Sequence, residues 1–390
     1  MTVRKVRFGR VAALVNERAG DADFRIGLEA VEQRTGRLLS ARDADYQGEG
    51  IGFRRGDVLF GKLRPYLAKV WRADRGGAAV GDFHVYRPVT DRVDPDYLKY
   101  CLLADSFISP VSSSVYGAKM PRASWDFIRN VEILVPSMDE QRAIADFLDR
   151  ETAQVDTLIA KQQRLIATLR ERRGAVVAHA LRAVGTARSR LKYHAAVQTG
   201  ITLSGDGELS APEWPYLRVA NVQAGRVDLD EVKTIRVTEE AARRSMLRAG
   251  DVLMTEGGDI DKLGRGAIWR DEIAPMLHQN HVFAVRPGLN ITPEYLSLWL
   301  EGTEAREYFL LTAKKTTNLA STNKWTLGNL PIAVPALVEQ HAITSFVDEH
   351  AARINTLIQK SERLIELSQE RRSALITAAV TGQIDVRKAA

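Results

Sequence analysis

The sequence contains one long segment twice, first at Val135–Arg182 and again at Val334–Val380. Both copies begin with a proline that precedes a Glu-Gln pair, and both later carry a Leu-Ile pair and a Glu-Arg-Arg triplet. Equivalent residues lie 199 positions apart, as Pro136 and Pro335 do, and no gap interrupts the match. A gapless copy of this length indicates an internal duplication, so the fold must be built from two related halves.

Each copy has the features of one long helix. Neither copy has an internal proline after its start, and Gly382 follows the second copy as a stop signal. Apolar residues recur at alternating spacings of four and three, with polar interruptions such as Glu151 and Arg172, which is typical of a short coiled coil. At 1.5 Å per residue, about 45 residues make a helix of roughly 65–70 Å. We expect this seam to pack against another helix or a partner at Ile144, Leu148, Leu158, Leu165, Ile343, Val347, Leu357 and Leu364.

A lone helix of this length would leave its apolar seam in water, so each copy needs a partner. The simplest partner is the other copy, packed antiparallel through pseudo-two-fold symmetry. Two alternatives stay open at this point. The two helices could face solvent independently, or each could dimerise with a second chain.

The composition is that of an ordinary globular protein. Its 390 residues suit two or three domains, and 45% of them are hydrophobic, which is enough for real cores. The single cysteine, Cys101, excludes a disulfide framework and a cysteine-rich zinc site. Because the sequence has neither a membrane-length apolar run nor a signal-peptide start, we expect a soluble cytoplasmic protein. The net charge of +6 is modest support for a polyanionic partner.

The segments before the two long helices, Val6–Ile133 and Leu191–Ile332, resemble diverged copies of one mixed domain. In each, a Gly-Asp pair predicts a tight turn that leads into a buried strand, and a later proline starts a helix. We therefore expect an α+β fold, with two mixed α/β globules separated by two long antiparallel helices. The expected boundaries are 1–135 for the first globule, 136–184 for the first helix, 185–334 for the second globule and 335–390 for the second helix and tail.

Two patterns that could carry chemistry are weak. Gly56–Leu63 nearly fits a phosphate-binding loop, but Leu63 stands where a Mg²⁺-binding hydroxyl is needed. His278 and His281 lie three positions apart, so on a strand they face opposite sides, and no third metal ligand is evident. A strand, a turn and polar loop residues account for both patterns. The sequence shows neither a methyltransferase signature nor a Gly-x-Ser-x-Gly elbow.

The best candidates for a binding surface are loops that combine basic, amide and aromatic side chains. They lie at matching places before each long helix. Arginine and lysine bond guanine edges or phosphates, and asparagine and glutamine bond adenine edges. We therefore expect these loops to contact DNA. The expected set is Lys62, Arg64, Tyr66, Lys119 and Arg122 in the first globule, and Glu256, Lys262, Arg265, Lys314, Lys315, Asn318, Asn323 and Lys324 in the second.

Over nearly its whole length the chain resembles the specificity subunit of type I restriction-modification systems. The resemblance is carried by the two Pro-x3-Glu-Gln helix starts, Leu158-Ile159 and Leu357-Ile358, the Glu-Arg-Arg triplets, the Gly-Asp-Val-Leu turns and the ending Thr381–Val386. It implies two target-recognition domains that each read one half of a bipartite double-stranded DNA site. It also implies that the antiparallel helices act as a spacer and dock two modification (methyltransferase) subunits.

The same resemblance implies that this chain has no catalytic residue, binds no metal and carries no cofactor. S-adenosylmethionine would belong to the modification subunits, and ATP and Mg²⁺ to partner subunits that include the restriction subunits. Individual base contacts do not carry over, because members of this family differ most in their recognition loops.

Two other functions stay open. A metal-dependent nuclease would use Asp228, Asp230, Glu231 and Lys233, although such triplets occur often by chance and need carboxylates on a rigid sheet. A coiled-coil scaffold without nucleic acid would show no salt-dependent DNA binding, whereas phosphate contacts weaken as salt rises.

Overall fold

The computed structural model describes residues 4–20, 22–39, 49–115, 120–182, 184–185, 187–202, 210–223, 225–258, 263–264, 266–315 and 320–386. The chain forms two compact units. Unit 1 comprises Met1–Arg164 and Ser361–Ala390, and unit 2 comprises Leu165–Lys360. Each unit therefore joins one globule to one part of each long helix.

A four-stranded antiparallel sheet forms the centre of unit 1. Its order is β2 (Ala12–Val15), β8 (Phe83–Pro88), β5 (Val58–Gly61) and β6 (Val70–Arg72). Successive strand residues point to opposite faces, so Phe60 enters the core that includes residues of helices α1 (Pro95–Leu103) and α2 (Asp105–Ser113), while Leu59 enters a second core. That second core also includes residues of a small sheet of order β3 (Arg25–Ile26), β7 (Gly77–Val80) and β4 (Gly50–Phe53).

The remaining elements of unit 1 are short. They are β1 (Arg4–Arg7), η1 (Phe8–Arg10), β3 (Arg25–Ile26), η2 (Leu28–Ala30), β4 (Gly50–Phe53), η3 (Pro65–Leu67), β7 (Gly77–Val80), α3 (Trp125–Ile128) and β9 (Glu132–Val135).

Unit 2 repeats this plan. Its central sheet has the order β11 (Ala195–Thr199), β20 (Val282–Pro287), β16 (Val252–Thr255) and β18 (Gly266–Ile268). Helices α6 (Pro293–Glu301) and α7 (Thr303–Thr312) follow, as α1 and α2 do in unit 1. The expectation that the two globules are diverged copies is confirmed by this shared order.

The other elements of unit 2 are also short. They are β10 (Ser189–Arg190), η4 (Leu191–Tyr193), β12 (Glu213–Leu217), η5 (Val219–Asn221), β13 (Val222–Gln223), β14 (Arg226–Val227), β15 (Lys233–Arg236), α5 (Glu239–Arg244), β17 (Gly257–Gly258), β19 (Leu277–His278), β21 (Lys314–Lys315), β22 (Ala320–Ser321), α8 (Lys324–Gly328) and β23 (Pro331–Ile332).

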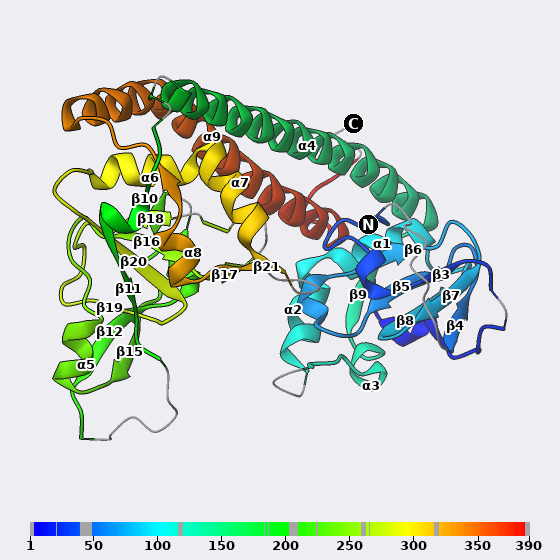
Figure 1. The fold of residues 1–390 in the computed structure, drawn as a ribbon. Coiled ribbons are helices and arrows are strands. Elements are labelled where there is room, and N and C mark those ends of the chain that lie inside the picture. The colour runs from blue at the N-terminus through cyan, green and yellow to red at the C-terminus, as the bar shows by residue number, and fades with distance from the viewer. Residues whose placement is uncertain are drawn as a thin grey trace. The chain divides into compact units, whose positions relative to one another are not determined.

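The two copied segments form the long helices α4 (Met138–Arg182) and α9 (Leu337–Val380) (Figure 1). In unit 1, the start of α4 shares a core with the end of α9, through residues such as Leu148 and Ile376. In unit 2, the end of α4 packs against the start of α9, through residues such as Val177 and Val347. The helices therefore run antiparallel within each unit, as expected, and the α+β fold class with an internal repeat is confirmed.

The seam between the helices differs in part from the predicted ladder. Leu148 and Val347 are buried as predicted, but Ile144 and Ile343 are only partly buried. The fully buried seam positions include Ala145, Leu148, Thr152, Val155 and Leu169 in α4, and Thr344, Val347, Ala351, Ile354 and Ser368 in α9. The two sets lie 199 residues apart, so both helices use the same seam.

The predicted seam is wrong at four leucines. Leu158, Leu165, Leu357 and Leu364 are each 38–42% exposed. Each is followed by an isoleucine that is less exposed, and one of these, Ile166, is buried. Alternating spacing cannot choose between two adjacent apolar residues, which explains the error. Whether the four leucines contact a partner stays a prediction.

The Glu-Gln pair at each helix start fixes the long helix to its own globule. Gln141 is fully buried, and its Oε1 accepts a hydrogen bond from the backbone N–H of Asp94 at 2.8 Å. Its Nε2 donates to the carbonyls of Arg92 and Pro136 at 3.0 and 2.9 Å. Gln340 makes the three equivalent bonds in unit 2, at 2.8–2.9 Å. The motif therefore repeats because a buried amide has to satisfy the same three backbone groups in both units.

Candidate nucleic-acid interface

A buried aspartate fixes the turn that precedes each candidate loop. Asp57 accepts two hydrogen bonds from Arg87, Nε to Oδ1 at 3.1 Å and Nη2 to Oδ2 at 3.0 Å. Asp251 accepts the same pair from Arg286, at 2.8 and 2.7 Å. Gly56, just before Asp57, has a φ of +92°, which explains why glycine stands there. Strands β5 and β16 therefore leave equivalent turns and end at equivalent places.

The predicted DNA-contacting residues of unit 1 gather where β5 ends. Leu63 pairs with Arg122 in a β-bridge, and the Ala123 N–H donates to the Lys62 carbonyl at 2.9 Å. Arg64 follows in a left-handed conformation, with a φ of 51°, and its N–H donates to Pro121. The structure thus brings the loop that starts at Lys62 against the segment that contains Arg122.

Asp82 lies at the centre of this cluster, and the sequence analysis missed it. Arg122 donates to both of its carboxylate oxygens, at 2.9 and 3.0 Å, and Lys62 Nζ lies 3.8 Å from Oδ1. The hydrogen bond from Arg122 holds the pKa of the Asp82 carboxyl below its usual range. Two cations therefore surround one carboxylate, which leaves the cluster with excess positive charge. Tyr66 follows in the same loop and is 48% exposed.

His84 lies two residues beyond Asp82 on β8 and is buried. Burial, and then repulsion by Lys62, lower the pKa of its imidazole to about 4. Its Nδ1 lies 3.0 Å from the Tyr86 hydroxyl. His84 is therefore neutral at pH 7 and adds no charge to the cluster.

The candidate residues of unit 2 gather where β16 ends. Strand β17 pairs with β22, and β22 pairs with β21, which holds the exposed Lys314 and Lys315. The Thr322 N–H donates to the Glu256 carbonyl at 2.8 Å. The structure thus brings Glu256 and the two lysines to one small sheet.

Two further candidates of unit 2 lie at the start of α8. Asn323 is its N-cap, and its side chain accepts the Thr326 N–H at 2.8 Å, so this amide already has a structural role. Lys324 is exposed at the first helical position. Four other candidates, Lys119, Lys262, Arg265 and Asn318, lie outside the residues that the structure describes.

The two clusters occupy equivalent positions and carry opposite charges there. The Lys62 N–H donates to the Asp82 carbonyl at 2.9 Å, and the Glu256 N–H donates to the His281 carbonyl at 2.9 Å. The side chains pair in the same way, since His281 Nδ1 lies 2.6 Å from Glu256 Oε2. Unit 1 therefore has a lysine just after β5 and an aspartate opposite it. Unit 2 has a glutamate just after β16 and a histidine opposite it.

The weaker sequence patterns have ordinary structural roles. The stretch from Gly56 to Leu63 is a turn followed by strand β5, so it does not form a phosphate-binding loop. His278 is fully buried on β19, and its Nδ1 lies 2.7 Å from the Val282 carbonyl oxygen, while His281 pairs with Glu256. The two histidines therefore serve different sites.

The residues of the proposed nuclease motif are also engaged locally. Glu231 Oε1 lies 3.4 Å from Arg218 Nη2 and 3.8 Å from Lys233 Nζ, and Asp228 Oδ1 accepts the Asp230 N–H at 3.1 Å. Within the described ranges, no three His, Cys, Asp or Glu side chains group closely enough to hold a metal ion. In the same part of the chain, no helix combines the length and the apolar character needed to cross a membrane.

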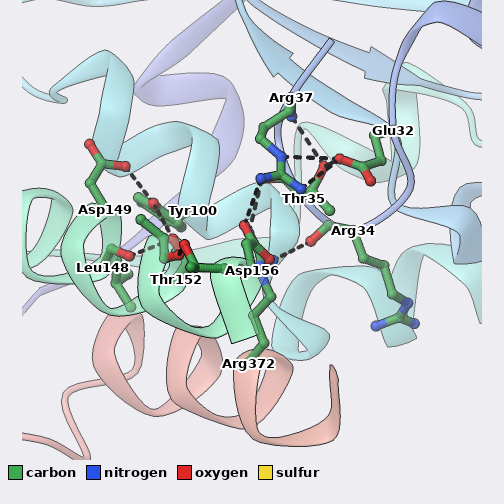
Figure 2. A network of polar contacts seen from close by, with 12 residues as sticks. Glu32, Arg34, Thr35, Arg37, Tyr100, Leu148, Asp149, Thr152, Asp156 and Arg372 are labelled. Atoms are coloured by element: carbon green, nitrogen blue, oxygen red, sulfur yellow. Dashed lines mark hydrogen bonds and ion pairs between the residues drawn. The ribbon is translucent and has the colours of Figure 1, made fainter. Parts of the chain in front are cut away.

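A polar network fastens the globule of unit 1 to its helix pair (Figure 2). Arg372 of α9 is only 5% exposed, and its Nε donates to Asp156 of α4 at 3.2 Å. Its two Nη groups donate to the carbonyls of Arg34 and Thr35, the second at 3.0 Å. Arg37 Nη1 completes the network, 3.2 Å from Asp156.

Unit 2 fastens its globule differently. Arg173 takes the place of Arg372 but bonds Glu301 of α6 at 2.5 Å, and Asn355 stands where unit 1 has Asp156. The attachment of each globule to the helices has therefore diverged, although both helices bury equivalent seam positions.

The comparisons with known proteins agree with this organisation. No family model matches the chain. The chain is 23% identical over 291 residues to the type I restriction enzyme EcoKI specificity subunit of Escherichia coli (strain K12), a match that covers 71% of this chain and 62% of the relative. It is 22% identical over 318 residues to the EcoBI specificity subunit of Escherichia coli, covering 71% and 64%. The matches thus span less than two thirds of the length of these relatives.

The fold has a solved counterpart. A chain in the structure described as "Structural basis underlying complex assembly and conformational transition of the type I R-M system" has a TM-score of 0.65 and 18% sequence identity, and the match covers 98% of each chain. At this level of identity the likeness shows the fold. The curated relatives confirm the resemblance to type I restriction enzyme specificity subunits that the repeated helix motifs predict, and the solved chain shows that the fold is shared.

Proposed function

We propose that the chain is the DNA sequence-specificity subunit of a type I restriction-modification complex, in which each globule reads one half of a bipartite site. The observation that carries the proposal is the shared position of Lys62 and Glu256. Two globules with the same sheet order and the same buried Asp-Arg turn present opposite charges at one loop. Two domains that recognise different base sequences need different side chains in their loops, and they can share one backbone fold.

The chemistry of the two loops suits base edges of different kinds. In unit 1, Lys62 and Arg122 supply donors, which match the O6 and N7 acceptors of guanine. In unit 2, Glu256 supplies an acceptor, which matches the amino group of cytosine, while Lys314 and Lys315 supply charge for phosphates. We infer that the two half-sites differ in sequence for this reason.

The long helices are proposed to set the distance between the half-sites and to dock two modification subunits. Support comes from apolar residues that stay outside the helix seam, with 38–44% of each side chain exposed: Leu158, Leu364 and Leu367 in unit 1, and Leu165 and Leu357 in unit 2. Exposed apolar residues on otherwise polar helices are typical of a partner surface. Both units carry such residues, which suits two partners.

Catalysis is assigned to those partners. In this proposal the chain has no catalytic residue, S-adenosylmethionine is bound by the modification subunits, and ATP and Mg²⁺ serve partner subunits that include any restriction subunits. The chain then works in the cytoplasm, where the DNA lies. Experiment identifies the recognised bases, the spacing between the two half-sites and the methylated base.

Mapping of methylated positions in the source genome, with and without this chain, tests the proposal. We expect one bipartite motif whose methylation disappears with the chain and returns with it. Loss of the chain without loss of any motif would contradict the proposal. A purified chain that cuts DNA with Mg²⁺, and stops when Glu231→Ala is introduced, would favour the nuclease instead. If the chain binds no DNA even at low salt, the result favours the coiled-coil scaffold without nucleic acid.

A further inference from the structure

Unit 2 carries a second basic and aromatic surface, outside the loops that the sequence singled out. It surrounds a shallow cleft of about 620 Å³ between β10, η4 and α8. Tyr193 and Trp325 line the cleft, and their side chains are 69% and 75% exposed. Two large aromatic residues exposed on one cleft form a patch that is typical of a binding surface.

Arg190, which lines the cleft, and the adjacent Lys192 are both held by an uncharged amide. Asn329 Oδ1 accepts hydrogen bonds from Arg190 Nη1 at 3.3 Å and from Lys192 Nζ at 3.1 Å. The amide of Asn329 is itself fixed, because its Nδ2 donates to the Trp325 carbonyl at 2.8 Å. Among the described residues, no carboxylate lies within ion-pair distance of either cation. A neutral amide thus positions two positive charges about one oxygen and leaves both charges for a ligand.

The neighbouring Arg188 shows the contrast. It donates to both carboxylate oxygens of Glu304, at 2.8 and 2.7 Å, and these hydrogen bonds lower the pKa of that carboxyl. Its charge is therefore balanced inside the protein. Arg190 and the adjacent Lys192 differ from Arg188, because no carboxylate of the described residues forms an ion pair with them.

The equivalent place in unit 1 has different chemistry. Strand β1 pairs with β9 as β10 pairs with β23, which makes Gly9 and Arg10 the counterparts of Lys192 and Tyr193. Asp126 is the counterpart of Trp325, since both backbone carbonyls accept a hydrogen bond from an asparagine four residues later at 2.8 Å. Arg7 is the counterpart of Arg190, so unit 1 keeps one of the two cations. Gly9, Arg10 and Asp126 stand where unit 2 has Lys192 and the two aromatic residues.

We propose that this cleft binds the sugar-phosphate backbone of double-stranded DNA next to the half-site read by unit 2. Arg190 and Lys192 would bond one or two phosphates, and Trp325 and Tyr193 would pack against the adjoining deoxyribose rings. The charge of the cleft favours a polyanion over an apolar protein surface. Trp325 also directly follows Asn323 and Lys324, two of the residues expected to contact DNA, so one strand could cover both surfaces. This inference rests on the proposed function.

Contacts to the DNA backbone carry no sequence information. Loss of such contacts should therefore weaken binding to specific and random duplexes alike. The probes are a labelled duplex that contains the mapped methylation motif and a labelled duplex of random sequence, both with the full chain. We expect Arg190→Gln with Lys192→Gln to weaken binding to both duplexes by a similar factor, and to reduce the slope of log affinity against log salt by about 1–2. Trp325→Ala with Tyr193→Ala should weaken both by about tenfold. Arg243→Gln with Arg244→Gln on α5 removes the same charge from another exposed face of unit 2 and serves as the control.

Fluorescence gives a second readout that a folding defect does not imitate. Trp325 is the exposed tryptophan among those that the structure describes, so it dominates collisional quenching by acrylamide. Duplex DNA should protect the wild-type chain from this quenching and should leave the quenching of Trp325→Phe nearly unchanged.

The outcomes separate this inference from the proposed function. If the wild-type chain does not distinguish the two duplexes at all, the proposed function fails. If it does distinguish them, while the cleft variants bind both duplexes as tightly as the α5 control, only the cleft inference is overturned. Variants that bind DNA normally but no longer assemble with a modification subunit would overturn it too, since the cleft would then bind protein.

Discussion

Lys62 and Glu256 stand at the same point of the two units and carry opposite charges. Each donates its backbone N–H to the residue that precedes the next strand of the sheet, at 2.9 Å in both units, and each pairs its side chain with that same residue. The backbone around them is shared, and the side chains are not. One shared backbone position therefore carries a positive charge in unit 1 and a negative charge in unit 2.

Reversal of the charge at one position should change one half of the recognised site. We expect Lys62→Glu to alter base preference in the half-site of unit 1, with the other half-site unchanged, and Glu256→Lys to do the opposite. Each lost or wrong bidentate contact should cost about 1–3 kcal/mol of discrimination. Binding selection from a duplex library with two randomised half-sites measures both. A change in both half-sites from one substitution would argue against separate readers.

The buried glutamine at the start of each long helix should stabilise its own unit. Gln141→Leu leaves one N–H and two carbonyls without their partner, at about 1–3 kcal/mol for each buried group that stays unpaired. Hydrogen exchange measured by mass spectrometry should show lost protection in unit 1 with little change in unit 2, and Gln340→Leu should give the reverse. Gln163→Leu, at an exposed position of α4, is the control and should change little.

His84 should make unit 1 sensitive to acid. Burial keeps the pKa of its imidazole near 4 in the folded chain, against 6.5 as the ordinary value. Between these values the unfolded chain binds the proton and the folded chain does not, so stability falls as pH drops through this window. The loss should reach about 3 kcal/mol by pH 4.

The internal repeat supplies the variant for that test. Phe283 pairs with Met254 in unit 2 as His84 pairs with Phe60 in unit 1, so His84→Phe installs the residue that the other unit already has. Urea unfolding of unit 1 at pH 7 and at pH 4.5 should show a smaller loss of stability for the variant than for the wild type. Equal losses would mean that His84 does not control the acid response.

Arg372 should contribute more to the stability of unit 1 than its exposed neighbour Arg371 does. Arg372→Ala leaves the nearly buried Asp156 with Arg37 alone and leaves the carbonyls of Arg34 and Thr35 unpaired. We expect unit 1 to lose about 2–4 kcal/mol, since two carbonyls lose their donor and Asp156 keeps only one of its two cations. Arg371→Ala, which removes an exposed side chain, should cost under about 0.5 kcal/mol. Denaturation profiles of the two variants, followed by exchange protection in unit 1, give the comparison.

The sequence predicts the long helices and the repeat well, because their signals are local. The Pro-x3-Glu-Gln starts place the helix beginnings within two residues of Met138 and Leu337, where a capping glutamate and a buried glutamine act over a few positions. The residues that face the other helix are harder to predict from sequence. At each Leu-Ile pair both residues are apolar, and only the contact between the helices decides which one turns inward.

The partners in the candidate sites could not be predicted from local sequence. Asp82 reaches Lys62 because β8 pairs with β5, and Asn329 reaches Arg190 because β23 pairs with β10. Such contacts depend on strand order, which no single stretch of sequence records. The exposure of Trp325 and its position in one cleft with Tyr193 likewise depend on how α8 and η4 pack, which local sequence does not record.

The most direct test of the whole account changes the length of both long helices at once. Seven residues, inserted after Arg164 in α4 and after the equivalent Arg363 in α9, add two helical turns and keep the seam in register. At 1.5 Å per residue the insertion adds about 10.5 Å, which corresponds to about three base pairs of duplex DNA at 3.4 Å each. Sequencing of methylated motifs should then show the same two half-sites with a spacer longer by about three base pairs. A chain that still assembles and methylates, with an unchanged spacer, would contradict the claim that these helices set the distance between two readers.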